Sequence, residues 1–225
     1  MVPEGEKRQV LVKKGVKVRT FAAELKKKGL IYTPTYFTVA YISQHPSKTL
    51  QAGLYEINDQ DTLLDLVEKI ARGYSILESL TIIEGWDWSQ TRKALQYEKR
   101  FARHSDKEIL RYINKKYANS IWGRDLSSPE GILMPDTYKF KRGISDLVII
   151  DDAYKKQENF MRSVWDDRDL QTGYKTPYEA LIVASLIEKE SCYPPEYPKI
   201  AAVILNRIKK KIPIQIDASI LYGLP

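Results

Sequence analysis

The segment with the clearest capacity for chemistry is LIVASLIEKES, residues 181–191, which places carboxyl groups at the end of an expected apolar helix. A period of 3.6 residues puts four side chains on one face: Val183, Leu186, Ile187 and Glu190. We therefore expect Glu190 to lean into the apolar stripe, with Glu188 to the side and Lys189 on the far side. Burial and the negative end of a helix dipole both favour a protonated carboxyl group. A protonated carboxyl group on a rigid helix is what a general acid requires.

The sequence also predicts where this helix begins. Thr176 is a suitable N-cap, Pro177 suits the first helical position, and Glu179 completes a capping box. Many helices end in a glutamate that reaches water or pairs with a lysine. The helical position alone therefore leaves a purely structural role for Glu190 open.

Three sequence blocks extend the pattern. ASLIEKES at 184–191 is followed by KIAAVILNRIKKKIPIQIDASILYG at 199–223, and EGILMPDTY lies upstream at 130–138. In type, order and spacing these blocks resemble the endolytic murein transglycosylase family (MltG, YceG-like), and the similarity runs from about Val10 to Pro225. The family tends to have a proline where this chain has Ala218, which puts the local turn in doubt.

The resemblance implies an α+β fold with a LysM-like β-α-α-β module at 1–75 and a catalytic domain at 76–225 that is incomplete at its C-terminus. LysM modules bind N-acetylglucosamine polymers, but a packing or positioning role is equally open here. Matching residues to the motif makes Glu190 the catalytic acid and base, with Glu188 as its competitor. The expected substrate-binding residues are Ser191, Asn206, Arg207, Gln215, Asp217, Asp136 and Tyr138. Trp122 or Tyr193 would offer a sugar-stacking face.

The chemistry implied is lytic rather than hydrolytic. One glutamate would protonate the bond between N-acetylmuramic acid and N-acetylglucosamine, then remove a proton from the C6 hydroxyl, which closes a 1,6-anhydro ring. An intramolecular nucleophile has a high effective molarity, which explains how a second carboxylate can be dispensed with. Glu130 remains a possible second acid. The family further implies no cofactor, peptidoglycan strands as substrate and cell-wall synthases such as penicillin-binding proteins as partners. It also implies an inner-membrane anchor ahead of this segment, which would lie on the extracytoplasmic side.

Composition limits the alternatives. The net charge is +7 with 43% hydrophobic residues, and lysines are scattered without a nucleic-acid-binding motif. One cysteine, Cys192, excludes an intrachain disulfide, and two histidines make a structural zinc site improbable. A non-catalytic glycan-binding or scaffolding protein is the main alternative. A pyridoxal-phosphate lyase, the family's older label, would need a phosphate cradle that is not visible.

Hydrophobic periodicity outlines the elements. Strands are expected at 10–12, 53–57 and 80–83, and helices near 18–28, 36–42, 62–72, 106–118 and 146–165, with another from about residue 89. The stretch 120–141 is expected to be loop-like.

Overall fold

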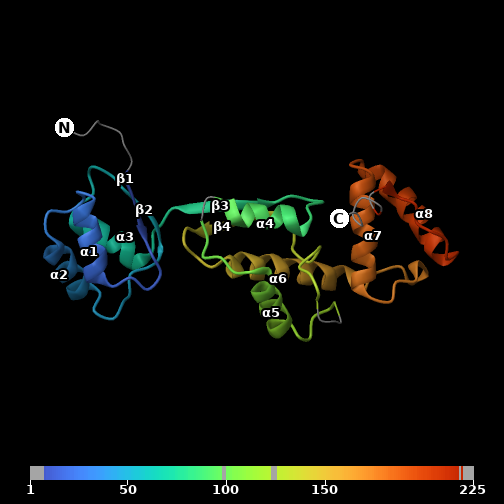
Figure 1. Cartoon of the computed structure of the whole chain (residues 1–225), viewed down its shortest axis with the longest axis horizontal. Helices are drawn as coiled ribbons and strands as arrows, with labels where there is room; N and C mark the ends of the chain where they lie inside the picture. Colours follow the sequence, from blue (N-terminus) through green and yellow to red (C-terminus); the bar gives the residue numbers. More distant parts are fainter. Residues whose placement is uncertain (1–7, 98–99, 123–125, 218, 220–225) are drawn as a thin grey trace. The chain divides into compact units, whose positions relative to one another are not determined.

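The computed structural model describes residues 8–97, 100–122, 126–217 and 219 of the 225-residue chain (Figure 1). Contacts within the chain divide it into two compact units. The first contains residues 1–80 together with 95–103 and 137–148. The second contains residues 81–94, 104–136 and 149–225.

The N-terminal part of the first unit has the predicted β-α-α-β-α order. Its elements are β1 Arg8–Val12, α1 Val18–Lys27, α2 Pro34–Gln44, β2 Gly53–Ile57 and α3 Leu63–Arg72. Strands β1 and β2 pair antiparallel, with Val10 opposite Tyr55. In Figure 1 the three helices gather around this strand pair. The element order agrees with the sequence, while the LysM-like character of this unit and its glycan binding both stay predictions.

Local signals fix the ends of α3. The Thr62 side chain accepts from the backbone N–H of Asp65, whose carboxylate accepts from the Thr62 N–H in return. Gly73 ends the helix with φ of 73°, a left-handed conformation that glycine adopts without strain. Between these caps, Leu66 and Ile70 turn into a core whose fully buried aromatic members are Phe21, Phe37, Tyr41 and Tyr55.

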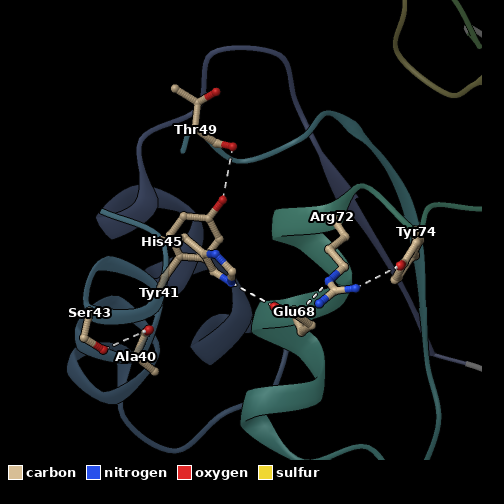
Figure 2. A network of polar contacts seen from close by, with 8 residues as sticks. All are labelled: Ala40, Tyr41, Ser43, His45, Thr49, Glu68, Arg72 and Tyr74. Atoms are coloured by element: carbon tan, nitrogen blue, oxygen red, sulfur yellow. Dashed lines mark hydrogen bonds and ion pairs between the residues drawn. The ribbon is translucent and has the colours of Figure 1, made fainter. Parts of the chain in front are cut away.

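A polar network joins α2 to α3 at the edge of this core (Figure 2). His45 Nε2 lies 2.9 Å from Glu68 Oε2, and the other oxygen of Glu68 accepts from Arg72. On α2, the Tyr41 hydroxyl donates to the Thr49 carbonyl at 3.1 Å. The network satisfies polar groups around a core that is otherwise apolar.

The rest of the chain is mainly helical. Its elements are β3 Leu77–Ile82, α4 Trp88–Gln96, α5 Asp106–Lys116, β4 Asp136–Lys141, α6 Asp146–Trp165, η2 Leu170–Thr172, α7 Pro177–Glu190, η3 Pro194–Glu196 and α8 Tyr197–Lys209. Strands β3 and β4 form a second two-stranded sheet. The prediction that 120–141 is loop-like is therefore wrong over its last six residues. Buried Tyr138 and Phe140 alternate there with exposed Thr137 and Lys139, which is the period of a strand.

A carboxylate hub fastens α5 to α6. The hydroxyls of Tyr112 and Tyr117 donate to Asp151 at 2.9 and 2.6 Å, and the ammonium groups of Lys116 and Lys155 pair with the same carboxylate. Burial opposes ionisation of Asp151, but these hydrogen bonds outweigh it and hold its pKa well below the usual range. The hub therefore carries negative charge at neutral pH.

The mixed helix and strand content confirms the predicted α+β class. The predicted domain boundary between residues 75 and 76 stays a prediction. Within the described ranges, no helix combines the length and apolar character needed to cross a membrane.

Candidate active site

Helix α7 begins where the sequence predicts. Thr176 is the N-cap, and its hydroxyl accepts from the Glu179 N–H at 3.2 Å. The return contact differs from the predicted capping box, because the Glu179 carboxylate accepts from the Lys175 N–H at 2.7 Å rather than from Thr176. Pro177 occupies the first position, where a missing N–H costs nothing.

The apolar stripe of α7 packs against α8 and the segment after it. Val183 is buried together with Ile204 of α8 and Ile216. Leu186 and Ile187 join the same cluster, as does a set of partly buried residues: Tyr174, Ile200 and Ile214. The residues that follow α8 are thus held against the last turns of α7.

Glu190 does not continue this stripe. It is the last residue of α7 and its side chain is exposed, so the predicted burial is wrong. The cluster packed around Val183 includes Leu186 and Ile187 but not Glu190. Glu190 is the last helical residue, because Ser191 continues the chain in an extended conformation, with φ of −147° and ψ of 142°.

The turn after Glu190 orders its own polar groups. The Ser191 hydroxyl donates to Glu196 Oε2 at 2.7 Å and accepts from the Tyr193 N–H at 3.1 Å. Ser191, predicted to bind substrate, thus fixes the α7–α8 turn. Tyr193 is 60% exposed, so its ring is open to a ligand.

Arg207 and Gln215, both predicted to bind substrate, come together. The Nη1 group of Arg207 donates to the Pro213 carbonyl at 2.9 Å and to Gln215 Oε1 at 2.8 Å. Gln215 has a φ of 53°, a left-handed conformation that is strained for a non-glycine residue. Arg207 therefore clamps a strained loop. Asn206 and Asp217 flank this loop with exposed side chains.

Two loops of the second unit lie against α7. A Cβ atom at Gly85 would be 3.5 Å from Glu188 Cγ and 3.7 Å from Lys189 Nζ, and one at Gly131 would be 3.5 Å from Leu181 Cδ2. Both glycines have a φ of 72°. Lys189, expected on the far side of the helix, thus points to the turn that contains Gly85.

Glu130 is the half-buried carboxyl group of this region. Its Oε2 accepts from the backbone N–H of Trp88, the first residue of α4, at 2.8 Å. Burial raises the pKa of Glu130, and Asp87 adds to the rise, while the hydrogen bond from Trp88 and the charge of Lys189 act the other way. The sequence motif marks Glu130, but only the fold brings it to the start of a helix 42 residues earlier.

The remaining predicted residues lie apart from this arrangement. Tyr138 is 2% exposed and Trp122 is 1% exposed, so neither offers a face to a ligand. The Trp122 ring instead packs edge-on to Tyr178 at 6.4 Å. Asp136 pairs with Lys156 at 2.8 Å on α6. No group of three or more His, Cys, Asp and Glu side chains suited to a metal ion occurs among the residues described.

The sequence matches the YceG-like family over residues 10–225. The chain belongs to this family. This YceG-like chain is 29% identical over 223 residues to the endolytic murein transglycosylase of Bacillus subtilis strain 168, covering 93% of the chain and 61% of that protein. It is 24% identical over 235 residues to the endolytic murein transglycosylase of Streptococcus pneumoniae serotype 2 strain D39, covering 94% and 42%.

A solved structure supports the fold. A putative YceG-like protein from Listeria monocytogenes matches 97% of this chain and 75% of its own with a TM-score of 0.51, at 24% identity. At that identity the likeness concerns the fold alone. The YceG-like chain spans less than two thirds of the length of the two transglycosylases it matches.

Proposed function

We propose that this chain carries the catalytic glutamate of an endolytic murein transglycosylase, which cuts peptidoglycan between N-acetylmuramic acid and N-acetylglucosamine. The observation that carries the proposal is the position of Glu190. Glu190 is exposed at the end of helix α7. The loop that Arg207 clamps contains Ile214, which packs in the same cluster as Leu186 and Ile187 of that helix. Relatives named endolytic murein transglycosylases match nearly the whole chain.

In the proposed reaction Glu190 acts twice. Its carboxyl group first donates a proton to the glycosidic oxygen as the C1–O bond breaks. The resulting carboxylate then takes the proton of the C6 hydroxyl of the muramic acid, whose oxygen bonds to C1 of the same ring. The products are a 1,6-anhydro end and a free 4-hydroxyl end, and Glu190 regains its proton.

Because Glu190 is exposed in the free chain, the bound substrate itself would have to shield its carboxyl group from water. In the free chain water reaches the carboxyl group. A bound glycan strand would exclude that water, which strengthens electrostatic interactions at the reacting atoms. Exposed Tyr193, Gln215 and Asn206 supply an aromatic ring and two amides for sugar contacts.

The site of action follows from the substrate. Peptidoglycan lies outside the cytoplasmic membrane, so we expect this segment on the extracytoplasmic side, tethered to the inner membrane in the whole protein. There it would work beside the synthases that deliver nascent strands.

The test compares two neighbouring glutamates. Purified peptidoglycan is incubated with the parent chain, Glu190→Gln and Glu188→Gln, and the products are analysed for anhydro-muropeptides by mass spectrometry. We expect the parent and Glu188→Gln to release them, whereas Glu190→Gln falls by at least about a thousandfold, the scale of losing an acid and base together.

The contrary results are equally clear. Loss in Glu188→Gln alone would transfer the role to Glu188. Binding without cleavage by the parent chain would favour the non-catalytic, glycan-binding alternative. Oxygen-18 incorporated from water at the new ends would show hydrolysis and would require a second carboxylate, with Glu130, Asp136 and Asp217 as the candidates.

A further inference from the structure

A small pocket lies between the β3–α4 turn and the loop that contains Glu130. Its floor includes buried Ile82 and Leu133, and Ile83, Trp86 and Trp88 form part of its wall. The cavity volume is about 30 Å³, so the pocket has room for a group the size of a methyl and none for a sugar ring.

The rim of the pocket is polar on one side. Asp87 lines it, and the hydrogen bond from the Gln90 backbone lowers the pKa of this carboxyl group, so that it is ionised at neutral pH. Asp87 Oδ1 accepts from Gln90 N at 2.7 Å, and the backbone and side chain of Ser89 also hydrogen-bond to this carboxylate. A carboxylate offers about four acceptor positions, so one remains for a further N–H donor.

Helix α7 supplies a hydrogen-bond donor, Lys189, near the pocket. Lys189 Nζ lies 3.7 Å from the Cβ position of Gly85, in the turn between Ile83 and Trp86. Its charge acts on both Asp87 and Glu130. The next residue along the chain is Glu190. The pocket thus adjoins the end of α7 on which the proposed acid stands.

We propose that this pocket binds the N-acetyl group of one hexosamine of the glycan strand. An acetamido group presents a methyl group, an N–H and a carbonyl oxygen. The pocket wall receives the methyl group, Asp87 accepts from the N–H and Lys189 donates to the carbonyl oxygen. Glu130 is a positioning residue, because its hydrogen bond to the Trp88 N–H holds one wall of the pocket at the start of α4.

This subsite rests on the proposed function, since it places a sugar beside Glu190, but it makes a prediction of its own. Recognition should depend on the acetyl group. Soluble peptide-free glycan strands, the same strands chemically N-deacetylated, and deacetylated strands acetylated again serve as probes. Binding is measured by calorimetry with the Glu190→Gln variant, which keeps the strands intact.

We expect the Glu190→Gln chain to bind N-acetylated and re-acetylated strands about tenfold more tightly than deacetylated ones. Adding Trp86→Ala should abolish this preference. Trp165→Ala is the matched control: Trp165 ends α6, packs under the Arg168 guanidinium and does not line the pocket, so the preference should persist. Ile83→Phe, at an exposed lining position, fills the pocket without opening a cavity and should also remove the preference.

Three outcomes overturn the inference. Equal affinity for acetylated and deacetylated strands would show that the acetyl group is not read, even if the parent chain still releases anhydro ends. A preference that survives both Trp86→Ala and Ile83→Phe would place acetyl recognition elsewhere. A parent chain that neither binds nor cuts any strand would defeat the proposed function as well, so the two failures are distinguishable.

Discussion

Removing the Arg207 guanidinium tests whether the loop after α8 is held by a clamp. Arg207 makes two hydrogen bonds, to the Pro213 carbonyl and to Gln215 Oε1. We assign about 1 kcal/mol to each, because the site is partly exposed. The left-handed conformation of Gln215 costs about 1 to 2 kcal/mol, so the clamp roughly balances this strain. Arg207→Ala should therefore raise the opening equilibrium of the loop by about thirtyfold.

Hydrogen exchange read by mass spectrometry measures this opening. In Arg207→Ala we expect faster exchange over residues 211–217, with the melting temperature lowered by less than about 2 °C because the opening is local. Lys209→Ala, an exposed basic residue on the same helix, is the control and should not change exchange there. Adding Gln215→Gly relieves the strain and should restore about fivefold of the lost protection.

The activity of the same variants links the clamp to the site. If the loop forms part of the sugar-binding surface, release of anhydro-muropeptides should fall about tenfold in Arg207→Ala and remain at the parent rate in Lys209→Ala. Unchanged exchange over 211–217 in Arg207→Ala would refute the clamp. Faster exchange in Arg207→Ala that Gln215→Gly fails to slow would refute the balance of energies.

Three further predictions concern stability. Asp151→Asn should lower the melting temperature by about 4 to 8 °C, from about 2 kcal/mol of lost charged hydrogen bonds, whereas exposed Asp152→Asn should change little. Because folding lowers the pKa of Asp151, its contribution is present above pH 4, and the difference between parent and Asp151→Asn should shrink as pH falls below 4. Ile204→Ala should cost about 2 to 4 kcal/mol in denaturant unfolding, against less than about 1 for half-exposed Ile208→Ala. Burial raises the pKa of Tyr55 to about 12, so the first unit should lose stability between about pH 10 and 12, and Tyr55→Phe should lessen that loss in an alkaline circular-dichroism titration.

Short-range patterns predicted most elements correctly. The predicted helices at 18–28, 62–72, 106–118 and 146–165 all occur, with ends close to those expected. Each depends on side chains three or four residues apart and on caps within the same turn. Strand β4 was missed because a strand is stabilised by its neighbour, and its partner β3 lies more than 50 residues earlier in the chain.

For the candidate site, too, local sequence patterns predicted some features, and the folded chain decided the others. Sequence by itself determined that α7 begins after Thr176, that an apolar stripe runs along it, and that its last turn carries two glutamates. It also marked Glu130 as a possible second acid and Gln215 as a candidate substrate-binding residue, roles that stay predictions. Such features are visible because they are set by composition and by local spacing.

Only the tertiary structure decided which side chains meet and which reach water. Periodicity placed Glu190 in the stripe, but the cluster that α7 forms with α8 and the loop after it includes Val183, Leu186 and Ile187 and not Glu190, which is exposed. The contact of Glu130 with the start of α4 and the clamp of Arg207 on Gln215 likewise arise from chain folding. Exposure and partnership depend on what packs from elsewhere in the chain, and no local period contains that information.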